Sequence, residues 1–219
     1  MIPAIAKILE YVSIFSVLIP LILGMIYYKR LDRNSRIVVI LLAFATIPQL
    51  GVFLPSMLVF YNIYTILESA IWGYLFYKNS RNKTIRRVIV IIIISLVILS
   101  VYIFSISGIA TRFFTEFVCL NSLLQVFWVL SFVYERYKRE EIKAVEKEPI
   151  FWFCLGLLVY APATYFRFAF YDLIGDKDYA VNIIHHLLNT AMYLIFSLGI
   201  IANVIRTSKL GNVFIRNRS

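Results

Sequence analysis

The chain has 219 residues, is 61% hydrophobic and carries a formal net charge of +10. Soluble domains are nearer half apolar, so a mean hydropathy of +0.83 excludes an ordinary soluble protein and predicts an integral membrane protein. The positive charge does not indicate a nucleic-acid partner, because the basic residues gather at the ends of apolar segments, where membrane topology explains them.

Seven apolar segments are long enough to cross a bilayer at about 20 residues per crossing. They cover residues 8–28, 37–54, 59–77, 85–106, 113–134, 150–174 and 179–205. The first is too long for a cleaved signal segment and is interpreted as a retained span. We therefore predict an all-α membrane protein, with a single seven-helix transmembrane domain over residues 1–219 and no soluble catalytic domain.

The basic residues predict the orientation of this domain. Of the 22 Lys and Arg residues, 18 follow the first, third, fifth and seventh segments and so lie on one side. The positive-inside rule assigns that side to the cytoplasm. The N-terminus is then outside, the C-terminus is cytoplasmic, and the expected location is the inner (cytoplasmic) membrane, as a multi-pass protein.

Three weak correspondences suggest a parallel repeat of three helices, a linking fourth helix and three more helices. The first and fifth segments end in Tyr-Lys-Arg, the second and sixth carry a proline, and the third and seventh open with Asn-Ile. Parallel repeats of this kind occur in transporters. Chance similarity among isoleucine-rich helices is the alternative explanation.

Arg167 lies inside the sixth apolar segment, where an arginine costs roughly 3 kcal/mol on insertion scales. At helical spacing it shares a stripe with Thr164, Tyr160, Gly156 and Phe153, so this face should meet protein or trapped water. A buried arginine needs a counter-charge.

Glu68, near the middle of the third segment, is the preferred partner of Arg167. Glu116 is the rival partner. The alternative to a functional role is that the ion pair only fixes helix packing.

Polar side chains of five segments fall at similar depths, about 8–15 Å from the predicted outer ends at a helical rise of 1.5 Å per residue. They predict an outward-facing polar cavity above a packed apolar inner half. The candidate ligand-binding residues are Gln49, Asn62, Glu68, Asn121, Gln125, Tyr160, Arg167, Tyr171, His185, His186 and Asn189.

Neither a metal nor a cofactor is expected. His185 and His186 alone are too few for a zinc site, which usually needs three protein ligands. Cys119 and Cys154 lie in apolar segments and are interpreted as small core residues.

Three short motifs carry a resemblance. They are Tyr64-x-x-x-Glu68, Pro149-Ile150-Phe151-Trp152 followed by Gly156 and Tyr160, and His185-x-x-x-Asn189. With these motifs the chain resembles a family of small seven-helix membrane proteins common in Bacteroidota. The resemblance covers most of the chain and implies an inner-membrane protein, but it supplies no activity.

The preferred functional hypothesis is a receptor-like sensor or signalling partner that binds a small ligand in the outward cavity. Its partners would be the bilayer, that ligand and a cytoplasmic or membrane signalling protein, and the sequence does not decide between a monomer and a homo-oligomer. A retinal Schiff base is excluded, because residues 179–205 contain no lysine.

Two alternatives come from other classes. A small-solute transporter of SWEET or PQ-loop architecture is suggested by Pro48-Gln49, although the matching position reads Ala161-Pro162-Ala163. An intramembrane lipid hydrolase would need clusters of His, Asp or Ser. Only one aspartate, Asp172 near the end of the sixth segment, lies within a span, and only two histidines are present, so an enzyme is the less favoured class.

Overall fold

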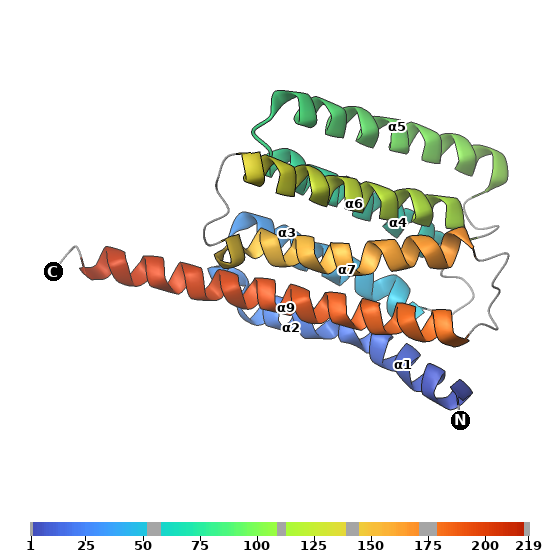
Figure 1. Cartoon of the computed structure of the whole chain (residues 1–219), viewed down its shortest axis with the longest axis horizontal. Coiled ribbons are helices and arrows are strands. Elements are labelled where there is room, and N and C mark those ends of the chain that lie inside the picture. Colours follow the sequence, from blue (N-terminus) through green and yellow to red (C-terminus); the bar gives the residue numbers. More distant parts are fainter. Residues whose placement is uncertain (1, 52–57, 109–112, 139–144, 171–178, 217–219) are drawn as a thin grey trace.

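The computed structural model describes residues 2–51, 58–108, 113–138, 145–170 and 179–216. Within these ranges the chain forms an antiparallel bundle of helices and contains no strand (Figure 1). The two termini lie at opposite ends of this bundle. The elements are α1 (Ile2–Ser16), α2 (Leu18–Ile26), η1 (Tyr28–Arg30), α3 (Arg33–Leu50), α4 (Leu58–Asn79), α5 (Lys83–Ser107), α6 (Thr115–Lys138), η4 (Val145–Lys147), α7 (Pro149–Ala169) and α9 (Tyr179–Arg216).

Five helical stretches in the described ranges are long and apolar enough to cross a membrane. They are Ala4–Ile26, Lys83–Ser107, Thr115–Lys138, Pro149–Ala169 and Tyr179–Ser208. The prediction of an all-helical, multi-pass membrane protein is therefore confirmed at this level. Helices α3 and α4 fall short in hydropathy because α3 begins with charged residues and α4 carries polar side chains, such as Asn62 and Ser69, that are buried inside the bundle.

The first predicted span has a one-residue break in its helical hydrogen bonding at Val17, whose backbone remains helical. Helix α1 ends at Ser16, and α2 begins at Leu18. Pro20 explains the position of the break: its ring lacks the N–H that would bond to the carbonyl of Ser16 and clashes with that carbonyl. The two helices still follow one another along the bundle (Figure 1).

Helix starts extend beyond the apolar segments where a polar residue caps them. The Asp32 side chain accepts a hydrogen bond of 2.8 Å from the Ser35 amide, so α3 begins at Arg33 instead of residue 37. Asn82 likewise caps α5 through the amides of Thr84 and Ile85. Helix α7 opens with Pro149 in its first turn, where the missing N–H of proline costs no hydrogen bond.

The two ends of the bundle differ in character. We call the end where α1, α4, α6 and α9 begin the N-terminal end, and the opposite end, where the lysine- and arginine-rich turns lie, the basic end. The apolar core occupies the half next to the basic end and includes Trp72, Trp128, Phe153, Phe196 and Ile200. Helix α5 lies at the edge of the bundle (Figure 1), and most of its side chains are exposed.

Candidate functional site

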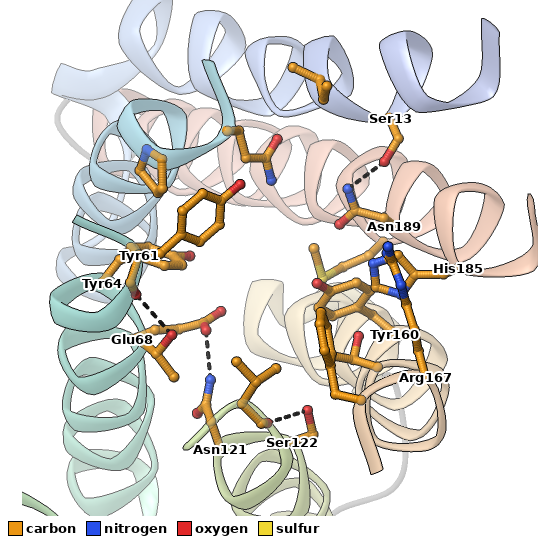
Figure 2. A pocket seen from close by; sticks show the side chains of 18 of the residues that line it. Ser13, Tyr61, Tyr64, Glu68, Asn121, Ser122, Tyr160, Arg167, His185 and Asn189 are labelled. Carbon is orange, nitrogen blue, oxygen red and sulfur yellow. Dashed lines mark hydrogen bonds between the residues drawn. The ribbon is translucent and has the colours of Figure 1, made fainter. Parts of the chain in front are cut away.

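A cavity of about 590 Å³ lies among the helices in the half of the bundle next to the N-terminal end. Helices α1, α3, α4, α6, α7 and α9 all contribute to its wall, whereas none of the α5 residues does so. Figure 2 shows the polar and aromatic side chains that point into it. The cavity lies in this half because antiparallel packing places the first halves of α1, α4, α6 and α9 beside the last halves of α3 and α7.

Nine of the eleven predicted site residues line this one cavity. They are Gln49, Glu68, Asn121, Gln125, Tyr160, Arg167, His185, His186 and Asn189. Asn62 does not line it: its side-chain oxygen accepts a hydrogen bond of 3.3 Å from the Phe114 amide and ties α4 to the start of α6. Tyr171 lies outside the described residues. The sequence pattern thus brought most of the residues together correctly, while their role in binding stays a prediction.

Glu68 lies in the wall that α4 and α6 form. Its carboxyl group accepts a 2.7 Å hydrogen bond from the Asn121 side-chain amide. The oxygen of that amide accepts in turn from the Ser69 hydroxyl, which fixes the orientation of the amide. The polar groups of Tyr64 and Gln125 also approach the carboxyl group, so Glu68 is held by neutral donors.

The predicted ion pair between Glu68 and Arg167 is wrong. Among the residues that the structure describes, no Lys, Arg or His side chain forms an ion pair with Glu68. Arg167 instead lies on the opposite wall with Tyr160 and His185 (Figure 2), and its guanidinium carbon is 5.3 Å from the centre of the Phe168 ring.

Depth explains the error. Glu68 comes ten residues after the start of α4, whereas Arg167 comes two residues before the end of α7. At 1.5 Å per residue these positions correspond to about 15 Å and about 3 Å from the helix ends. Glu116, the rival partner, is an exposed residue in the first turn of α6 and does not line the cavity.

Four tyrosines converge on the cavity, and only Tyr160 was among the predicted site residues. Tyr61, Tyr64, Tyr160 and Tyr193 all line it. Of these four, Tyr64 approaches the Glu68 carboxyl group. Helical register contained the signal for the others, because Tyr61 and Tyr64 precede Glu68 by seven and four residues and therefore share its face.

Helix α9 supplies the longest polar stripe in the wall. His185, Asn189 and Tyr193 follow one another at four-residue spacing and are all buried. The Asn189 amide donates to the Ser13 hydroxyl at 2.7 Å, and the Tyr193 hydroxyl accepts from the Gln49 amide at 2.5 Å. These bonds join α9 to α1 and to α3 at the level of the cavity.

Several polar atoms in the wall lack a protein partner in the described part of the chain. They are the side-chain oxygens of Gln49, Thr164 and Asn189 and the Nδ1 atom of His185. Buried polar atoms are nearly always hydrogen-bonded. Their gathering around one cavity indicates that they bond to water or to a ligand inside it.

The half of the bundle beneath the cavity has no comparable opening. Trp72 contacts Phe196 with ring centres 5.8 Å apart, and Phe196 contacts Phe153 at 5.5 Å. Farther along α9, the Asn203 side chain bonds to the Ser35 hydroxyl and to the Asp32 amide, so it is used in helix packing. The predicted arrangement, a polar layer next to a packed apolar half, is confirmed for the described residues.

No family model, curated protein or solved structure matches the chain. Among the described residues, no three His, Cys, Asp or Glu side chains come together in a group that could hold a metal ion. His185 and His186 are adjacent, with ring centres 5.7 Å apart, and line the cavity beside Arg167. The cavity offers two carboxyl groups, those of Glu10 and Glu68, together with tyrosine rings and hydrogen-bonding atoms that have no protein partner in the described part of the chain.

Proposed function

We propose that this protein is a receptor-like membrane sensor or signalling partner that binds a small ligand in the cavity. The observation that carries this proposal is a cavity of about 590 Å³ that combines apolar walls with several polar side chains and lies next to a packed aromatic core. Pockets of roughly 300–1,000 Å³ are typical of small-molecule sites. In this proposal the chain has seven spans in the inner membrane, and the basic residues place the N-terminal end outside and the basic end in the cytoplasm.

Helix α9 offers a physical link between the cavity and the cytoplasm. It runs without interruption from Tyr179 to Arg216, about 57 Å at 1.5 Å per residue, which is nearly twice the roughly 30 Å hydrocarbon core of a bilayer. Its first half carries His185, Asn189 and Tyr193, and its last turns extend beyond the other helices (Figure 1). A ligand that shifts α9 therefore moves a cytoplasmic segment that a partner protein can contact.

The competing function is a small-solute transporter, in which the cavity would open to each side in turn. Along the chain, α5 follows three helical rods and precedes three more, which is the order that a three-one-three arrangement requires. The core around Trp72 and Phe196 opposes it, because this core would have to separate to open a path to the basic end.

Cysteine accessibility distinguishes the two functions without knowledge of the ligand. Cys119 and Cys154 are first replaced by alanine, and a single cysteine is then introduced at Thr164 or Ser122, which line the cavity, or at Leu157 in the packed half. A small membrane-impermeant thiol reagent is applied to spheroplasts, which expose the outer face, and to inside-out vesicles, which expose the inner face.

A sensor is expected to show modification of both cavity cysteines from the outer face only, and no modification at Leu157 from either face. Modification of the cavity cysteines from both faces would favour a transporter. Failure of the reagent to reach them from either face would contradict a ligand site that is open to the outside.

A further inference from the structure

Glu68 is a half-buried acid whose carboxyl group has no basic partner among the residues that the structure describes. It faces a cavity rather than bulk solvent, and among the described residues its hydrogen-bond donors are neutral side chains such as Asn121. A carboxylate withdrawn from water is costly unless an opposite charge accompanies it. The described residues do not supply that charge, so either a proton on the carboxyl group or a bound cation has to remove the cost.

The aromatic residues around Glu68 are suited to the same kind of molecule. Tyr61 and Tyr64 lie on the helix that carries Glu68, and Tyr160 lies on the opposite wall (Figure 2). Tyr193 of α9 is the fourth tyrosine that lines the cavity. The face of an aromatic ring carries partial negative charge and attracts cations, and aromatic cages are a common means of holding ammonium groups. A carboxylate with several tyrosine rings combines charge attraction with this ring-face attraction.

The unpaired atoms of the wall point to the same chemistry. The free side-chain oxygens of Gln49, Thr164 and Asn189 are acceptors. They can satisfy the N–H groups of an amine or the hydroxyl groups elsewhere in a ligand. Arg167 belongs to the opposite wall (Figure 2), so a cation is expected to approach the wall of α4 and α6.

We propose that the cavity binds an organic cation, a small molecule with an ammonium group that is held by Glu68 and the surrounding tyrosine rings. This inference rests on the proposed ligand-binding function and names the chemical class of the ligand. It makes Glu68 the charge-recognising residue and assigns the tyrosines to recognition of the cation's apolar surface.

The test compares two probes that differ in charge and share their shape. Choline carries a quaternary ammonium, and 3,3-dimethylbutan-1-ol has a carbon atom in place of that nitrogen. Thermal unfolding of the full chain is followed in a maltoside detergent, free of choline lipids, with each probe in turn. A ligand at ten times its Kd should raise the Tm of a chain of this length by roughly 3–5 °C.

The variants separate charge from cavity volume. Glu68→Gln retains an acceptor for Asn121 but removes the charge, and Glu146→Gln removes an exposed carboxylate at the basic end as the matched control. Val118→Phe fills part of the cavity from α6. Val126→Phe places the same ring two turns farther along α6, outside the cavity wall.

Choline is expected to raise the Tm of the wild type and of Glu146→Gln more than the neutral probe does, and Glu68→Gln should bind choline at least about tenfold more weakly. If both probes stabilise the protein equally and only Val118→Phe abolishes the effect, the cation inference is overturned. Ligand binding in the cavity would then still be supported. If neither probe gives a shift that Val118→Phe abolishes, the cation inference fails. In that case, one-sided accessibility of cavity cysteines still tests the proposed function separately.

Discussion

Substitution of Gly156 by alanine perturbs the tight approach of α7 to α9. A Cβ atom at Gly156 would lie 2.6 Å and 2.8 Å from two carbons of the Phe196 ring and 3.2 Å from the Met192 carbonyl oxygen. Neither neighbour can yield easily, because the ring is clamped between Trp72 and Phe153 and the carbonyl belongs to the α9 backbone. Small residues permit this kind of close helix contact in membranes.

The expected loss of unfolding free energy is the cost of overpacking less the gain in helix propensity. Overpacking a well-filled core costs about 1–3 kcal/mol, and replacing glycine by alanine within a helix returns about 0.8–1.0 kcal/mol. Gly156→Ala should therefore lower the free energy of unfolding by up to about 2 kcal/mol. For a chain of this length that corresponds to a decrease in Tm of up to about 8 °C.

Gly73→Ala is the matched control on α4. The nearest atom to its Cβ would be the terminal carbon of Ile93 at 2.7 Å, the far end of a flexible side chain. Moving that side chain costs about 0.5–1.5 kcal/mol, which the gain in helix propensity largely offsets. The two variants are compared by thermal unfolding in detergent. Equal stability of Gly156→Ala and Gly73→Ala, or the reverse order, would refute the rigid contact between α7 and Phe196.

The remaining predictions concern the charges, the topology and one structural amide. The losses of stability in Glu68→Leu and Arg167→Leu, measured by thermal unfolding, should add in the double variant to within about 0.5 kcal/mol. A double variant that is more stable than this sum would show that the two residues pair. A cysteine at Ser107 should react with an impermeant maleimide on intact cells and a cysteine at Asn82 only after lysis, and the opposite pattern would invert the bundle. Asn62→Ala should destabilise the fold by about 1–3 kcal/mol and leave the response to choline unchanged, since a loss of binding with unchanged stability would assign this residue to the cavity.

The helices were predictable from the sequence because their apolar segments are long and uninterrupted. Each predicted segment overlaps a helix or, for residues 8–28, the pair α1 and α2. The differences occur where a local polar or proline interaction decides a boundary, as Asp32 does for α3 and Pro20 does for the end of α1. Hydropathy does not register these interactions, because they involve one or two residues within a segment of twenty.

The cavity was predictable as a layer, but its internal pairing was not. Helical periodicity places polar residues on one face and at an approximate depth, which sufficed to bring together Glu68, Asn121 and Asn189. A prediction that two side chains pair across helices requires the depth of both residues, which is measured from two predicted helix ends, and the rotation of both helices. An error of a few residues at each end displaces two side chains by several ångströms relative to one another.

That sensitivity explains why charge complementarity was misleading here. Arg167 was the obvious counter-charge for Glu68 by composition, yet the carboxyl group is bound by Asn121 while the guanidinium lies on the other wall. Had the two formed an ion pair, the charge of Glu68 would be balanced within the protein. Because the two are separate, Glu68 remains available to a molecule that enters the cavity. Helix α9 borders the cavity and extends beyond the bundle, so it is the element on which such binding would act.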